Sequence, residues 1–207
     1  MKLLIACVLL VSYPAFCYCG RSGSSGKSVT KAPSVEDKMK NATKLLGNNT
    51  TLFLVRAKHP LRILPGNENE SVCWNSTWIN KLNESRFQHN ISYFNVTAGR
   101  DPVLVQESGI WTVNEQKQLV SLQTRKTTPR IRGSWKIMEA QQDCMVVGLN
   151  NGTNKAICFY WMSSGRSRVG NTNCNTTYEL MCKSSSYPEY YWLKNCDQHN
   201  RPNGTSR

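Results

Sequence analysis

The sequence has 207 residues and a formal net charge of +13, with 26 Lys and Arg against 13 Asp and Glu. This length gives room for one domain, and no internal repeat divides it. The basic residues are scattered, and the densest group, residues 125–132, surrounds Pro129 and is predicted to be a solvated loop. The charge therefore does not indicate nucleic-acid binding, although it leaves open a weak affinity for sulfated polysaccharide or anionic membranes.

The first residues have the pattern of a secretory signal peptide. Lys2 precedes an apolar run at residues 3–11, and small residues follow up to Gly20. A membrane span needs about 20 apolar residues, and Pro14 interrupts this run. We predict a signal peptide at residues 1–19, a flexible Gly/Ser/Lys-rich leader at residues 20–33, and a secreted mature protein with no membrane span.

The nine cysteines indicate disulfides, because cleavage after residue 19 removes three and leaves six. An even number suits three disulfides in an oxidising compartment, and the spacing alone leaves their connectivity open. No Cys-x-x-Cys pair occurs, so no metal, redox site or cofactor is expected. The six are Cys73, Cys144, Cys158, Cys174, Cys182 and Cys196.

Eleven Asn-x-Ser/Thr tripeptides occur, many more than chance gives. In a secreted chain they predict a surface that carries N-linked glycans at many positions. The acceptors are Asn41, Asn48, Asn49, Asn69, Asn75, Asn83, Asn90, Asn95, Asn151, Asn175 and Asn203.

A capping box at Ser34 and Asp37 predicts a short amphipathic helix that ends at Gly47. Beyond it, short runs rich in β-forming residues alternate with polar turns, which favours an antiparallel barrel or sandwich. A second short helix is predicted at residues 173–181, within a barrel domain at residues 34–196 and before a polar tail at residues 197–207. The predicted strands cover residues 51–56, 72–79, 86–96, 109–113, 118–123, 134–139, 143–149 and 156–162.

Glycosylation predicts which strand residues point outward. Successive side chains of a strand alternate between its two faces, so a glycan on Asn75 would place Cys73 on the same outward face. In the same way, a glycan on Asn90 would define the outward face of the next strand. The inward side chains are then Trp74, Trp78, His89 and Tyr93.

The three histidines, His59, His89 and His199, form neither a nucleophile elbow nor a zinc-binding spacing. Since no catalytic constellation is found, we predict a binding protein and not an enzyme.

Glu107 and Glu139 are the candidates for an inward carboxylate. Glu139 shares a predicted strand face with Trp135 and Ile137, and this combination suits an ammonium ligand through ion pairing and cation–π attraction. The alternative is a carboxylate at the strand mouth in solvent, because a buried acid without a partner is costly.

The C-terminal half resembles a known family. A strand-like segment opens with Asp143-Cys144, a second follows as Cys158-Phe159-Tyr160-Trp161, and a Cys-bounded helix at residues 174–182 precedes Cys196. This order resembles the tick histamine-binding-protein family of lipocalins, and the resemblance covers about residues 34–196. It implies a mainly β, eight-stranded antiparallel lipocalin-like barrel with a short N-terminal helix and a C-terminal helix. The disulfides that it implies are Cys73 with Cys196 and Cys144 with Cys174, which leaves Cys158 with Cys182.

The resemblance also implies a function, the sequestration of a small host inflammatory mediator in the barrel by a monomer secreted in saliva. Because inward acids are few, a lipid mediator such as a leukotriene fits at least as well as histamine or serotonin. The alternative is a protein-binding inhibitor of host defence, for example of complement, that acts through loops at residues 61–70 and 125–132. The predicted ligand-binding residues are Trp74, Trp78, Tyr93, Glu107, Trp135, Glu139 and Phe159.

Overall fold

The computed structural model describes residues 33–59, 69–97, 100–125, 133–149, 156–163, 173–187, 189–191 and 196. All of them belong to one compact unit, Pro33–Arg207, and a second unit, Met1–Ala32, contains none of them. The predicted signal peptide, residues 20–32 of the predicted leader and the predicted tail lie outside the described residues.

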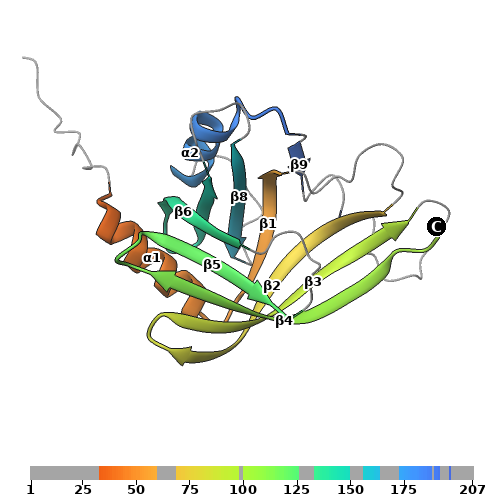
Figure 1. Ribbon diagram of the computed structural model, residues 1–207, viewed down its shortest axis with the longest axis horizontal. Coiled ribbons are helices and arrows are strands. Elements are labelled where there is room, and N and C mark those ends of the chain that lie inside the picture. The colour runs from red at the N-terminus through yellow and green to blue at the C-terminus, as the bar shows by residue number, and fades with distance from the viewer. Residues whose placement is uncertain are drawn as a thin grey trace, which may run out of the picture. The chain divides into compact units, whose positions relative to one another are not determined.

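Eight antiparallel strands close into a barrel (Figure 1). Each strand pairs with the next one in sequence, and β1 pairs with both β8 and β2, which closes the barrel. A short ninth strand, β9 (Glu189–Tyr191), pairs with the second half of β1, beyond the part that pairs with β2. The barrel strands are β1 (Thr51–Lys58), β2 (Asn69–Asn83), β3 (Arg86–Thr97), β4 (Val103–Asn114), β5 (Leu119–Thr124), β6 (Gly133–Ala140), β7 (Cys144–Leu149) and β8 (Ile157–Ser163).

The predicted eight-stranded antiparallel barrel is confirmed, and the bound that differs most from its prediction is the start of β4. The sequence pattern places the start of this strand at Gly109, but β4 begins at Val103. Gly109 lies inside the strand, where an added Cβ would be 2.6 Å from Cγ1 of Ile91. This glycine therefore permits close packing within the barrel and does not mark a strand boundary.

Helix α1 (Val35–Gly47) covers the end of the barrel that holds the short turns after β2, β4 and β6. Its predicted capping box is confirmed, since the Asp37 backbone amide donates to Ser34 Oγ and the Asp37 carboxylate accepts from the Ser34 backbone amide. The buried face of α1 belongs to the same hydrophobic cluster as the barrel interior and consists of Met39, Ala42, Leu45 and Leu46.

The strands separate two hydrophobic clusters. Alternating residues of β7 show this clearly, because Met145 and Val147 belong to the inner cluster and Val146 to an outer one. Helix α2 (Asn173–Cys182) contributes Tyr178 to the outer cluster and so covers this side of the barrel. The inner cluster contains most of the large aromatic side chains, and the candidate site lies there.

Three disulfides join Cys73 to Cys196, Cys144 to Cys174 and Cys158 to Cys182, the pairing that the family resemblance implies. The last two fasten α2 to the outer faces of β7 and β8. The prediction that Cys73 points outward is wrong, because this residue is buried in the inner cluster. Its φ of 61° and a register shift between Val72 and Asn75 interrupt the alternation on which the prediction depends.

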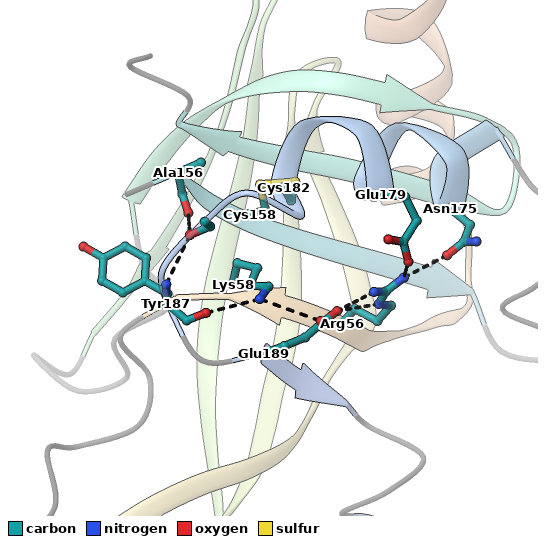
Figure 2. A network of polar contacts seen from close by, with 10 residues as sticks. Arg56, Lys58, Ala156, Cys158, Asn175, Glu179, Cys182, Tyr187 and Glu189 are labelled. Atoms are coloured by element: carbon teal, nitrogen blue, oxygen red, sulfur yellow. Dashed lines mark hydrogen bonds and ion pairs between the residues drawn. A yellow bond between two sulfur atoms is a disulfide. The ribbon is translucent and has the colours of Figure 1, made fainter. Parts of the chain in front are cut away.

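Arg56 holds α2 and β9 against β1 on the outside of the barrel (Figure 2). A register shift between Leu54 and Arg56 turns the guanidinium away from the interior. Its Nε donates to Glu189 Oε1 at 2.8 Å, and Nη1 donates to Asn175 Oδ1 at 3.1 Å. The guanidinium also pairs with Glu179 and lies 4.4 Å from the centre of the Tyr178 ring. These charge-assisted contacts compensate for the burial of Arg56.

Candidate functional site

Aromatic rings form a continuous wall inside the barrel. The ring centroids of Trp111 lie 6.3 Å from Trp135 and 5.6 Å from Trp161, the latter pair edge to face. Trp135 in turn lies 5.1 Å from Phe159, and Phe159 lies 5.1 Å from His59. Such spacings are typical of favourable aromatic pairs, each of which contributes about 0.5–1.5 kcal/mol. The wall runs across β4, β6 and β8 to the end of β1.

The alternation of strand residues explains why these rings meet. Along β4, the buried positions are Glu107, Gly109, Trp111 and Val113, so Trp111 faces the interior. Gly109 has no side chain, and this leaves space that Ile91 of β3 and Leu122 of β5 occupy.

A second aromatic pair lies on β2 and β3. The rings of Trp74 and Tyr93 stack with centroids 3.9 Å apart and planes inclined by 20°. Burial, and in addition the negative charge of Glu107, raises the pKa of Tyr93 above its usual 10.0. The Tyr93 hydroxyl therefore stays protonated, and can donate a hydrogen bond, over the whole physiological pH range.

Five of the predicted ligand-binding residues are buried on the inward strand faces. Of the other two, Trp78 shares the inward face with Ser76 and the opposed His89 but is less buried, and Glu139 points outward. Trp78 is half-buried and lies opposite His89 in the β2–β3 pairing, and its backbone amide donates to Thr50 O at 3.3 Å. The five buried residues on the inward faces are Trp74, Tyr93, Glu107, Trp135 and Phe159.

Glu139 does not share the face of Trp135, and this part of the prediction is wrong. A register shift between Ile137 and Glu139 places Glu139 opposite Val146, a residue of the outer cluster. Its carboxylate pairs with Lys38 of α1 at 3.3 Å. Among the described strand residues, Glu107 is then the acidic side chain left at an inward position. A role of either acid in ligand binding stays a prediction.

The sequence analysis missed two rings of the wall, Trp111 and Trp161, both fully buried. The signal for Trp161 is present in the sequence, because this residue follows the predicted inward Phe159 by two positions on one strand. Trp111 likewise follows Gly109 by two positions, but the short predicted strand at residues 109–113 contains no residue whose inward or outward orientation the sequence predicts.

His89 is fully buried and belongs to a chain of hydrogen bonds at the α1 end of the barrel. Trp111 Nε1 donates to Ser76 Oγ at 2.9 Å, Ser76 Oγ lies 2.9 Å from His89 Nδ1, and His89 Nε2 lies 2.9 Å from Leu46 O. A carbonyl oxygen only accepts, so Nε2 carries the proton and Nδ1 accepts from the Ser76 hydroxyl. Desolvation by burial lowers the pKa of His89 from 6.5, more than these two hydrogen bonds raise it.

The other predicted features are the glycosylation acceptors and the two loops. Asn151, Asn203, residues 61–68 and residues 126–132 are not among the described residues. Asn48, Asn49 and Asn83 are exposed, whereas Asn41 is half-buried and donates from Nδ2 to Ala140 O at 3.0 Å. The use of each acceptor stays a prediction.

In the part of the chain that the structure describes, no three His, Cys, Asp or Glu side chains come together as ligands for a metal ion. None of the described helices has the length and hydropathy that crossing a membrane requires.

No protein-family model and no curated protein matches the sequence. Among solved structures, the closed eight-stranded barrel with its two helices and three disulfides is that of the lipocalins. Japanin from Rhipicephalus appendiculatus bound to cholesterol is similar with a TM-score of 0.58 and 12% identity, over 73% of this chain and 98% of that chain. Apocrustacyanin C1 has a TM-score of 0.45 and 10% identity, over 72% of this chain and 77% of that chain. At 12% identity the likeness to Japanin establishes the lipocalin fold alone, and it does not single out the histamine-binding family.

Proposed function

We propose that this protein is a secreted binding protein that sequesters a small host inflammatory mediator inside its barrel. The observation that carries the proposal is the concentration of aromatic rings on the inward strand faces, where two groups of rings line one interior. Apolar walls with a few placed polar groups are typical of small-molecule sites. Function of this kind is stoichiometric and involves no turnover.

The charges of the interior favour an apolar mediator over a biogenic amine. Register shifts turn both Arg56 and Glu139 out of the barrel. Glu107 is the inward acid, and its position beside Tyr93 leaves one polar region in an aromatic interior. A lipid whose polar group is a hydroxyl, such as a sterol, matches this distribution, because the hydroxyl can donate to Glu107 while the apolar body contacts the rings. The single ammonium group of histamine or serotonin could also pair with Glu107, but these small amines would leave most of the aromatic surface without contacts. The similar structure of Japanin is bound to cholesterol, which agrees with this class of ligand.

The proposal is tested by native mass spectrometry. The protein is expressed in insect cells, deglycosylated and incubated with equimolar histamine, serotonin, leukotrienes, cholesterol and fatty acids. We expect one retained lipid adduct per chain, with a dissociation constant in the nanomolar range, or about 12 kcal/mol of binding free energy. An amine adduct would correct the ligand class, and a folded sample with no adduct would overturn the proposal.

A further inference from the structure

The hydrogen-bond chain of His89 connects the last turn of α1 to three barrel strands. Leu46 O belongs to the final turn of the helix, where backbone carbonyls have no partner within the helix. His89 Nε2 satisfies this carbonyl at 2.9 Å, and Nδ1 lies 2.9 Å from Ser76 Oγ, which also accepts from Trp111 Nε1. When His89 is neutral and carries its proton on Nε2, every polar atom in this chain of hydrogen bonds has a partner.

Protonation of His89 removes this match. The cationic ring donates from both nitrogens, so the Ser76 hydroxyl loses its acceptor and faces two donors, the rings of His89 and Trp111. The charge would also be buried at a position with no exposed surface. Leu46 O, at the negative end of the helix dipole, offsets this penalty only in part.

Among the side chains that the structure describes, none brings a compensating charge to His89. Burial is the largest influence on its pKa, followed by the hydrogen bonds to Leu46 and Ser76. Glu107 is the inward acid of β4, but it lies opposite Ile91 and acts on Tyr93. The other described charged side chains on the adjoining elements and in the turn between β2 and β3 are Lys38, which pairs with Glu139, and the solvent-exposed Glu36, Asp37, Lys40, Lys44, Lys81, Glu84 and Arg86.

We propose that His89 is an acid-sensitive latch: its protonation releases the end of α1 from the barrel and loosens the adjoining aromatic wall. Trp111 transmits the change, because its indole nitrogen belongs to the hydrogen-bond chain while its ring contacts Trp135 and Trp161. The released state exposes His89 to water, where its ordinary pKa of 6.5 applies. Release therefore becomes easier as the pH falls below about 6.5, since the released state binds the proton more tightly than the latched state.

The consequence for ligand affinity rests on the proposed function. If the wall holds a ligand, acid lowers the affinity by opening the α1 end and shifting Trp111. This coupling, the effect of pH on ligand affinity, is a consequence of the latch, and it is measured in an experiment separate from the one that tests the release of α1.

The test is hydrogen exchange of the α1 backbone amides, measured by NMR between about pH 7.5 and pH 5 and corrected for the intrinsic pH dependence. In the wild type, we expect protection of residues 39–47 to fall about tenfold across this range. His89→Gln keeps a donor for Leu46 O and an acceptor for Ser76 but has no titrating group, so its protection should not depend on pH. Equal acid sensitivity in the wild type and His89→Gln would overturn the latch.

Side-chain NMR of the wild type decides the matter if His89→Gln does not fold. Three histidines give separate titration curves, and His59 and His199 serve as internal references. We expect a pKa below 6.5 for His89, and a value at or above 6.5 would overturn the latch. Ligand titrations at the same pH values test the coupling. If the affinity does not fall together with the protection of α1, the coupling is refuted and the latch is not affected. If no ligand binds at all, the proposed function is refuted, and the exchange data still test the latch.

Discussion

The rings of Trp74 and Tyr93 stack with centroids 3.9 Å apart and join β2 to β3 on the inside of the barrel. Because the two residues point inward on neighbouring antiparallel strands, their ring faces pack against each other and form one aromatic surface. The nearby carboxylate of Glu107 adds one polar group to this surface. The site thus combines a large apolar area with a small polar region, as binding of an amphipathic lipid requires.

Replacing Trp74 with Leu should weaken lipid binding by about tenfold or more, because a ring in contact with ligand contributes about as much as an aromatic pair plus its buried area. Ile79→Ala is the control, since Ile79 lies on the same strand but is 44% exposed. Isothermal titration of both variants checks the prediction. Equal losses of affinity would place the ligand elsewhere.

Tyr93 should ionise above pH 10, because burial and the charge of Glu107 both disfavour the phenolate. A folded-state pKa above the unfolded value means that the stabilising contribution is complete below about pH 10 and is lost as the pH rises through the folded pKa. The difference between the ultraviolet titrations of the wild type and Tyr93→Phe isolates this residue. Glu107→Gln should bring the pKa of Tyr93 closer to 10.0, and an unchanged titration in that variant would disprove the electrostatic contribution.

Gly109→Ala should destabilise the fold by about 1–3 kcal/mol, since the added methyl group overlaps packed side chains. Its Cβ would lie 2.6 Å from Ile91 Cγ1 and 3.1 Å from Leu122 Cδ1. Thr112→Ala, on the same strand and half-exposed, is the control and should change the free energy of unfolding by much less. Urea denaturation measures both. A Gly109→Ala variant as stable as the wild type would show that the two side chains move aside freely.

Arg56→Met should lower the free energy of unfolding by about 2–3 kcal/mol, because it leaves two partly buried carboxylates without their guanidinium. Lys81→Met removes an ion pair with the exposed Glu84 and should cost less than about 1 kcal/mol. The contrast follows from burial, since the Arg56 side chain is 6% exposed and that of Lys81 is 46% exposed. Guanidinium denaturation of the two variants compares them, and similar losses would argue against the Arg56 network as a fastening for α2 and β9.

The positions of the strands and the helix cap were accessible from the sequence because they depend on local patterns. Ser34 and Asp37 form their capping box within four residues, and the eight β-rich runs correspond to the eight barrel strands. The inward orientation of Trp74, Tyr93 and Phe159 follows in the same way from alternation. Such predictions hold wherever the strand is regular.

The prediction of which way a side chain points fails where a bulge interrupts the strand. The face of Cys73 changes at the shift after Val72, and the face of Glu139 changes at the shift after Ile137. A bulge depends on how a strand pairs with its neighbour, which a single sequence does not show. The partners of His89 escaped prediction for a related reason, since Leu46 and Ser76 are brought to it by the closed barrel and not by proximity in sequence.

The most direct test of ligand binding in the barrel is quenching of intrinsic tryptophan fluorescence during titration with leukotriene and cholesterol, in the wild type and in Trp74→Leu. We predict saturable quenching at one ligand per chain in the wild type, with the midpoint shifted to higher concentration in Trp74→Leu. Quenching that does not saturate, or that has the same midpoint in both proteins, would contradict binding against the inward aromatic rings.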